Sequence, residues 1–387
     1  MHYNPASAKA IRMRIDSETA LIVSQPRYIS EGLFNRNLVG GIADLFHQGI
    51  RNNVTFGALP HYGAKILAAY ATEAGFKPEL VSLYDPQVVN MAKSSGVTLV
   101  SAMDIGLDQA RNVFTHLGPS NKILAGGYGI SADAQLLHRE FPWLTIIPGE
   151  AEGVLAHALS DLLNHGQMEP EYRRTSPFNL AQSASEPHLN PHIESKLHNL
   201  FGWTPVKVTE VSRGCPEACD FCPTAMLPTS VKPLDVLDTE VQNMHLKPWE
   251  PLVFLDQNLM VCPSDYLEAL FDYLNQRHIL WAGEGTITYL LNSPHLNEAA
   301  KHRLLRKMGK NCLAFLVGVE DLNGKTRGSA MKNDIAKSTH LEDMAKLLRE
   351  YRIPIVYSLI FASDSQEVGY ARHAADVVNT LGLTAAA

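Results

Sequence analysis

The chain has 387 residues, of which 45% are hydrophobic and 19% charged, so it is long enough for two globular domains. Its 33 basic and 40 acidic side chains leave a formal net charge of −7 without a long basic stripe, which disfavours nucleic acid as a partner. No apolar run reaches the length of a membrane span, and residues 1–5 lack the basic and apolar regions of a secretory signal, so we expect a cytoplasmic protein.

Short apolar runs alternate with amphipathic stretches between residues 19 and 164. Strands are predicted at 20–23, 79–83, 97–101, 122–125 and 145–150, and helices at 64–74, 108–117 and 154–163. This alternation is typical of a parallel α/β sheet with right-handed crossovers, whose ligands bind at the carboxyl ends of the strands. Four of those ends carry the dipeptides Ser24-Gln25, Ser101-Ala102, Gly126-Gly127 and Gly149-Glu150.

Residues 166–204 interrupt this rhythm with turn-forming Pro, Ser and Asn residues, and we predict an interdomain linker there. Beyond the linker, strands are predicted at 206–211, 251–255, 279–283, 312–319, 353–361 and 383–385, with helices at 238–245, 264–276, 297–308 and 341–351. The fold class is therefore α/β throughout. The predicted domains are an N-terminal extension over 1–18, a first domain over 19–165 and a second domain over 205–387.

The most informative motif is a group of three cysteines, Cys215, Cys219 and Cys222, spaced C-x3-C-x2-C directly after a predicted strand. Three thiolates on one short loop can bind three irons of a [4Fe–4S] cluster and leave the fourth iron open to a small molecule. A zinc site would need a fourth ligand nearby, and Cys262 and Cys312 are distant. An odd cysteine count in a long chain also argues against a disulfide framework.

An aromatic residue, Phe221, directly precedes the third cysteine and completes a motif that resembles the signature of radical S-adenosylmethionine (SAM) enzymes. The resemblance implies that the second domain is a partial (β/α)6 barrel, that SAM chelates the open iron, and that Phe221 lies beside adenine. It also implies SAM contacts from Asp256, Gln257, Glu284, Glu320, Ser358 and Ile360. A surface salt bridge is the alternative for Glu284, whereas an acid that ends an apolar strand, such as Glu320, needs a partner.

The first domain resembles the Rossmann-like cobalamin-binding domain that precedes the barrel in one large radical SAM subclass. The likeness rests on short elements in a fixed order: Leu59-Pro60-His61-Tyr62-Gly63, Glu73-Ala74-Gly75, Ser101-Ala102-Met103, Gly126-Gly127-Tyr128 and Gly149-Glu150-Ala151-Glu152. It implies cobalamin contacts from Ser24, Gln25, Tyr62, Gly63, Ser101, Ala102, Met103, Gly126, Gly127, Tyr128, Gly149 and Glu150. Ordinary turn geometry is the alternative explanation of the glycines, which otherwise let a backbone approach a flat ligand.

Methyl-transferring and mutase cobalamin domains carry Asp-x-His-x-x-Gly, whose histidine binds cobalt. The segment from Asp44 to Gly49 has a different spacing and a different position in the domain. We therefore interpret His47, His61 and His116 as ordinary histidines and predict that cobalt carries no histidine ligand.

Together the two resemblances imply a cobalamin-dependent radical SAM enzyme of the class B methyltransferase type, with a [4Fe–4S] cluster, SAM and cobalamin as cofactors. Methylation of an unactivated carbon is the commonest reaction of that subclass, here on a small molecule or a natural-product or peptide intermediate. An external one-electron reductant such as flavodoxin or ferredoxin is implied as well. Two alternatives stay open: a cobalamin-dependent ring rearrangement or cyclisation, and a radical SAM or iron–sulfur protein whose first domain no longer binds cobalamin.

Overall fold

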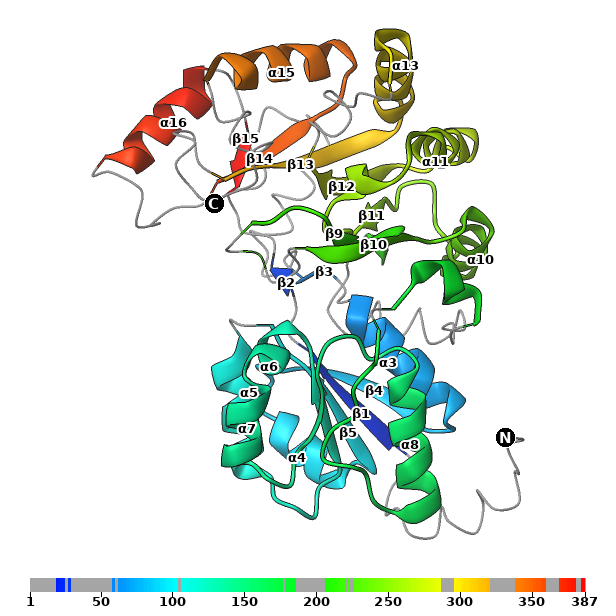
Figure 1. Ribbon diagram of the computed structural model, residues 1–387, viewed down its shortest axis with the longest axis vertical. Coiled ribbons are helices and arrows are strands. Elements are labelled where there is room, and N and C mark those ends of the chain that lie inside the picture. Colours follow the sequence, from blue (N-terminus) through cyan, green and yellow to red (C-terminus); the bar gives the residue numbers. More distant parts are fainter. Residues whose placement is uncertain are drawn as a thin grey trace. The chain divides into compact units, whose positions relative to one another are not determined.

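The computed structural model describes residues 19–24, 27–28, 58–59, 62–103, 106–176, 178–185, 206–219, 222, 226–286, 296–320, 338–359, 369–380 and 384–386. The chain divides into two compact units, each with its own parallel sheet (Figure 1). The first contains the described residues from Thr19 to Phe178, and the second contains Asn179–Ser183 and the described residues from Val206 onward. The predicted extension over 1–18 lies outside the described residues. In the described part of the chain, every helix is too short or too polar to cross a bilayer.

The first sheet has five parallel strands in the order β4-β1-β5-β6-β7. They are β1 (Thr19–Ser24), β4 (Lys77–Ser82), β5 (Val97–Ser101), β6 (Ile123–Gly126) and β7 (Thr145–Ile147). All five predicted strands are confirmed, with ends that shift by a few residues. The chain begins at β1, adds β4 on one side, and then adds β5, β6 and β7 on the other side. This is a doubly wound sheet, in which the winding direction reverses between β1 and β5.

Helices cover both faces of this sheet (Figure 1). One face packs against α3 (Tyr62–Glu73) and α8 (Val154–His165), and the other against α4 (Val88–Ser94), α5 (Leu107–His116) and α7 (Ala134–Glu140). Ala20 and Ile22 of β1 belong to the first of these cores, whereas Leu21 and Val23 belong to the second. A strand that is buried on both faces is apolar throughout, which explains the unbroken apolar run of β1.

The predicted helices correspond to α3, α5 and α8, and the structure adds α4, α7 and the short α6 (Tyr128–Ala132). These additional helices have at most seven residues each. A helix of that length completes too few turns to display a clear period of 3.6 in the sequence.

The first part of the predicted linker adds to the edge of the first sheet. Gly166 ends α8 with a left-handed backbone (φ 68°), a common helix terminus. The chain then runs beside β7, because Ile146 N donates to Pro170 O (2.9 Å) and Tyr172 N donates to Ile146 O (3.1 Å). The Tyr172 hydroxyl also donates to Asp161 Oδ2 of α8 (2.7 Å). A 3-10 turn, η4 (Leu180–Ser185), follows.

The second sheet has six parallel strands, each beside its predecessor in the chain. They are β8 (Lys207–Thr209), β11 (Leu252–Phe254), β12 (Trp281–Gly285), β13 (Cys312–Glu320), β14 (Ile355–Leu359) and β15 (Thr384–Ala386). The connecting helices are α10 (Leu234–Met244), α11 (Ser264–Gln276), α13 (Glu298–Met308), α15 (Ser338–Glu350) and α16 (Tyr370–Thr380). All six predicted strands and the four predicted helices are confirmed, and α16 is an addition.

Only one face of the second sheet packs against described helices, and it holds a single apolar core (Figure 1). Trp281 lies at its centre, stacked on Phe271 of α11 with ring centroids 5.4 Å apart. The residues that alternate with the core positions are half-buried: Val253, Ala282, Glu284, Leu316 and Gly318. A sheet that winds in one direction therefore leaves its second face partly open, as the inner wall of a barrel does.

Two antiparallel pairs complete the described structure. The strand predicted over 206–211 ends at Thr209, and the chain turns into a hairpin of β9 (Ser212–Cys215) and β10 (Leu227–Val231). A very short pair, β2 (Arg27–Tyr28) and β3 (Ala58–Leu59), lies in the first unit. The hairpin matters most, because its first strand ends on the first cysteine of the motif.

Candidate functional site

The three cysteines of the motif lie in the loop of the β9–β10 hairpin. Cys215 is the last residue of β9 and pairs with Leu227, the first residue of β10. Within the loop, Cys222 N donates to Cys219 O (3.1 Å) and Met226 N donates to Glu217 O (3.0 Å). Cys219 is buried, whereas Cys215 and Cys222 are half-buried, and none of the three forms a disulfide with another described cysteine. The hairpin therefore gathers the motif into one closed loop.

The loop begins at a tightly packed glycine. Gly214 has a φ of 85°, and a Cβ atom added there would lie 2.1 Å from Pro228 O of β10. No other residue type fits this contact without moving the backbone, because both the conformation and the space exclude a side chain. Cys215 is thus held one residue beyond a point where the two strands touch.

The donor set consists of three cysteine thiols on one short loop, which is the kind of ligand set that an iron–sulfur cluster takes. Among the described residues, no three His, Cys, Asp or Glu side chains converge closely enough to hold one ion. A cluster places each thiolate on a different iron, so its ligands need only share a loop. The remaining cysteines, Cys262 and Cys312, are buried in the apolar core, and burial raises the pKa of both thiols above its ordinary value.

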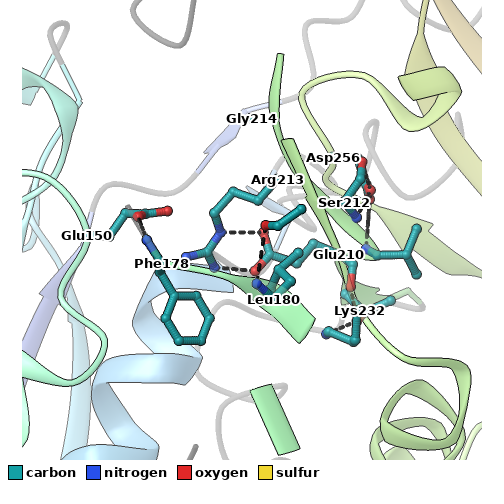
Figure 2. A network of polar contacts seen from close by, with 12 residues as sticks. Glu150, Phe178, Leu180, Glu210, Ser212, Arg213, Gly214, Lys232 and Asp256 are labelled. Carbon is teal, nitrogen blue, oxygen red and sulfur yellow. Dashed lines mark hydrogen bonds and ion pairs between the residues drawn. The ribbon is translucent and has the colours of Figure 1, made fainter. Parts of the chain in front are cut away.

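Asp256 follows β11, is fully buried and lies beside Ser212 of β9 (Figure 2). Its carboxylate accepts hydrogen bonds from the Ser212 amide, from Ser212 Oγ (2.6 Å) and from Val211 N (3.2 Å). Burial disfavours its charged form and raises the pKa of Asp256 to about 7, although the bonds from Ser212 act in the opposite direction. The expected contact between Asp256 and SAM stays a prediction; in this structure the Asp256 oxygens accept hydrogen bonds from the chain itself, and the residue is fully buried.

Gln257, the next residue, also contacts the cysteine hairpin. Its Oε1 accepts a hydrogen bond from Gly214 N (3.0 Å), directly beside Cys215. Two residues that were predicted to contact SAM thus bind the strand that ends on Cys215: Asp256 contacts Ser212, and Gln257 contacts Gly214. Gln257 is half-buried, so it stays a candidate for SAM as well.

A buried charged network surrounds the base of the hairpin (Figure 2). Arg213 forms an ion pair with Glu210, both with side chains about one-tenth exposed. On the other side, Lys232 Nζ contacts Glu240 Oε2 (2.6 Å), and Thr209 Oγ1 donates to the same carboxylate (3.0 Å). Buried charges of opposite sign satisfy each other, so removal of one partner leaves the other uncompensated.

The other predicted SAM residues are distributed over the carboxyl ends of the later strands. Glu284 lies on the half-open face of β12, Glu320 ends β13 at a shift in its register with β14, and Ser358 lies in β14. Parallel strands bring these ends to the same edge as the cysteine hairpin. Phe221 and Ile360 lie outside the described residues.

Asn258 is a residue at this edge that sequence reasoning missed. It is 1% exposed, and its Oδ1 accepts from Met260 N (3.2 Å) and from Thr286 N at the end of β12 (2.9 Å). Its Nδ2 finds no hydrogen-bond partner among the described residues. A buried amide with an unused donor is unusual and marks a polar position next to the ligand edge. The signal in the sequence is an amide four residues after the last residue of an apolar strand.

In the first unit, the predicted cobalamin residues Ser101, Ala102, Gly126 and Gly127 share one sheet edge. Ala102 N donates to Gly126 O (3.1 Å), and a Cβ atom on Gly127 (φ 97°) would lie 2.6 Å from Ala102 O. The loops after β5 and β6 are therefore pressed together, and Gly127 is required by the protein's own backbone. Ordinary turn geometry, the alternative explanation, accounts for Gly127.

The same edge shows two features that fit a bound group. Ser24 is fully buried where β1 ends, at the point of winding reversal, and its Oγ has no partner among the described residues. Gly149 follows β7 with a φ of 81° and open space where a side chain would be, while its amide donates to Ser131 Oγ (2.9 Å). An unpaired hydroxyl at a switch point is typical of a ligand site in such sheets, and the open backbone at Gly149, after the outermost strand β7, lies at the same carboxyl edge.

The remaining predicted cobalamin residues have mixed positions. Tyr62 and Gly63 begin α3, Tyr128 begins α6 and Met103 follows β5, all half-buried. Glu150 accepts a hydrogen bond from Phe178 N, so its carboxylate holds the first part of the linker. Gln25, His47 and His61 lie outside the described residues. His116 is exposed on α5, with Nδ1 against Asn112 O (2.8 Å).

No protein-family model matches the sequence, and no curated protein matches it either. Among solved structures, the fold is similar to that of TsrM from Kitasatospora setae, a radical S-adenosylmethionine methyltransferase with cobalamin and a [4Fe–4S] cluster bound. The match has a TM-score of 0.61 and 13% identity and covers 95% of this chain and 71% of that chain. A structure of TsrM with tryptophan substrate and the SAM analogue aza-SAM matches equally well, over 72% of that chain. At this identity the likeness shows a common fold.

Proposed function

We propose that this protein is a cobalamin-dependent radical SAM enzyme that methylates an unactivated carbon atom. The observation that carries the proposal is the position of the cysteine motif, in a closed hairpin loop after the first strand of a six-stranded parallel sheet. A doubly wound sheet in the first unit and a fold similar to TsrM over 95% of the chain support the same class.

In this class the cluster and SAM supply the radical that removes hydrogen from the substrate, and cobalamin supplies the methyl group. Within this chain, Cys215, Cys219 and Cys222 would bind one iron each as thiolates. The half-open face of the second sheet would take SAM, with Gln257, Glu284, Glu320 and Ser358 as polar contacts and Phe221 and Ile360 beside adenine. Cobalamin would lie along the edge of the first sheet.

The cobalamin assignment is supported by the unpaired hydroxyl of Ser24 and the open side of Gly149 at that edge. Ser101 and Gly126 end neighbouring strands of the same edge and would flank the ligand. The substrate is proposed to be a small molecule or a peptide intermediate, and an external one-electron reductant would supply electrons. Tryptophan is the substrate bound to TsrM.

Anaerobic reconstitution with iron, sulfide and cobalamin tests the proposal. We expect about four irons per chain, as one [4Fe–4S] cluster requires, together with a corrinoid absorption band. Incubation with SAM and a strong reductant should then cleave SAM. Methylation of a substrate would yield S-adenosylhomocysteine and a product heavier by one methylene group.

The other outcomes separate the alternatives. A cluster without bound corrinoid would indicate a radical SAM or iron–sulfur protein whose first unit has another role. Both cofactors with an isomeric or cyclised product and no S-adenosylhomocysteine would indicate rearrangement. A chain that binds no iron in spite of three intact cysteines would refute the proposal altogether.

A further inference from the structure

The contacts around Asp256, Gln257 and Asn258 (the 256–258 segment) form a connected set. These three residues follow β11, and their side chains accept hydrogen bonds from backbone amides in two other parts of the second unit. Two of the three are at most 1% exposed, so water does not compete for their oxygens. Hydrogen bonds in such surroundings are stronger and are costly to leave unmade.

The first two residues of the segment contact the strand that ends on Cys215. Asp256 accepts from Val211 N and from the amide and hydroxyl of Ser212, and Gln257 accepts from Gly214 N. These amides lie within the five residues that lead from β8 to Cys215. Because β8 ends at Thr209, its described hydrogen bonds with β11 in the six-stranded sheet do not extend to residues 210–214. Hydrogen bonds from backbone amides of this stretch to the side chains of the 256–258 segment take their place.

The third residue fixes the segment to the next strand. Asn258 Oδ1 accepts from Thr286 N, directly after β12, and from Met260 N within the turn that follows β11. Gly285 lies close enough that a Cβ atom there would be 2.9 Å from Asn258 Oδ1. The segment is therefore tied to β12 at one end and to the cysteine strand at the other.

We propose that the 256–258 segment positions the cysteine hairpin on the sheet, with Asp256 and Gln257 acting as positioning residues for Cys215. Neither residue needs to touch the cluster for this role, because each acts through the backbone of β9. The inference rests on the proposed function only in assigning iron to Cys215. The hydrogen bonds that carry it belong to the protein without cofactor.

Hydrogen–deuterium exchange of the full chain without cofactors tests the inference directly. Gln257→Leu removes the acceptor for Gly214 N at nearly constant volume. At a pH above about 7, where Asp256 is ionised, Asp256→Asn replaces one of its two acceptor oxygens by an amide donor that faces the donors of Val211 and Ser212. For both variants we expect amides 211–215 to exchange on the order of tenfold faster, with β13 and β14 unchanged. Gln257→Glu keeps an acceptor oxygen and should exchange like the parent protein.

A second readout uses the reconstituted protein. Iron should be lost to a chelator faster in Gln257→Leu than in the parent and in Gln257→Glu. Unchanged exchange at 211–215 in both test variants would overturn the inference, as would an equal increase over the whole second unit, which indicates general destabilisation. If Asp256→Asn does not fold, the pair of Gln257 variants decides. Failure of the parent to bind iron would refute the proposed function but leave the exchange result standing.

Discussion

The two parallel sheets of this protein are built from the same strand–helix unit but hold their candidate sites in different ways. The first sheet winds in both directions and is buried on both faces by two apolar cores, whereas the second winds in one direction and has one core. The first therefore offers a ligand only its edge. The second offers its edge and a half-open face as well.

The residues that shape the two edges also differ in kind. At the first edge the loops meet through backbone atoms, as Gly127 and Ala102 show. At the second edge the cysteine hairpin is held by buried side chains, above all Asp256 and Gln257. In the first unit, the most harmful substitutions should therefore be those that the backbone conformation cannot accept. In the second unit, they should be those that remove a buried polar partner. The predictions below test that difference, from the largest expected effect to the smallest.

The largest effect is expected for the cysteines of the motif. Replacement of Cys215, Cys219 or Cys222 by Ala should abolish cluster absorbance and SAM cleavage, because each thiolate binds one iron. Corrinoid binding should persist, since it depends on the first sheet. Cys262→Ala is the control and should retain its iron. Loss of the cluster in this folded control would contradict the three-ligand assignment.

Lys232→Met should destabilise the second unit strongly. Its side chain is 3% exposed and pairs with Glu240, whose side chain is 15% exposed, so the substitution leaves a largely buried carboxylate without its cationic partner. A cost of about 3–5 kcal/mol in the free energy of unfolding is expected, measured by urea denaturation. Lys301→Met is the matched control, because the partner of Lys301, Glu298, has a 75% exposed side chain and should lose little. Equal effects of the two substitutions would mean that buried polar partners do not stabilise this edge.

Gly127→Ala should destabilise the first unit through its backbone. The residue has a φ of 97° and a new Cβ atom would meet Ala102 O at 2.6 Å, so we expect a loss of about 1–3 kcal/mol. Gly149→Ala has a similar φ but open space, and should cost about 1 kcal/mol. A bulky residue such as Trp at 149 should block corrinoid binding while leaving the fold intact. Tolerance of Gly127→Ala would refute the backbone contact.

The pH dependence of stability should reveal Asp256. Its pKa is raised by burial from 3.8 to about 7, so between these values the folded protein holds a proton that the unfolded chain releases. The contribution of Asp256 to the free energy of unfolding is therefore fully present below pH 3.8, and it is lost as the pH rises from there to about 7. The slope attributable to Asp256 can approach about 1.4 kcal/mol per pH unit. Asp256→Asn should remove it, and identical slopes in the two proteins would exclude this assignment.

The smallest effect is expected for His116 of the first unit. His116→Ala should leave the spectrum of bound cobalamin unchanged, because His116 is exposed on α5 and occupied with its own helix. The cob(II)alamin form should show no superhyperfine splitting from an axial nitrogen in its electron paramagnetic resonance spectrum. Such splitting would instead reveal a histidine ligand that the spacing of the sequence did not predict.

Sequence reasoning was most successful where a single strand carries its own signal. The apolar run of β1 is buried on both sides, and every predicted strand appears near its expected position. It was least successful between residues 206 and 231, where the strand predicted over 206–211 ends at Thr209 and the hairpin of β9 and β10 was not predicted. The hairpin depends on pairing with residues beyond the cysteine loop, and a local pattern does not display such pairing.

The site shows the same division. The spacing of Cys215, Cys219 and Cys222 depends only on neighbours within one loop, so the sequence alone determined the candidate cluster ligands. The roles of Asp256 and Asn258 depend on amides that lie 28–45 residues away along the chain. A carboxylate or amide oxygen accepts a hydrogen bond equally well from a ligand or from a backbone amide. Only the tertiary structure therefore decides which of these two donors a buried side-chain oxygen meets.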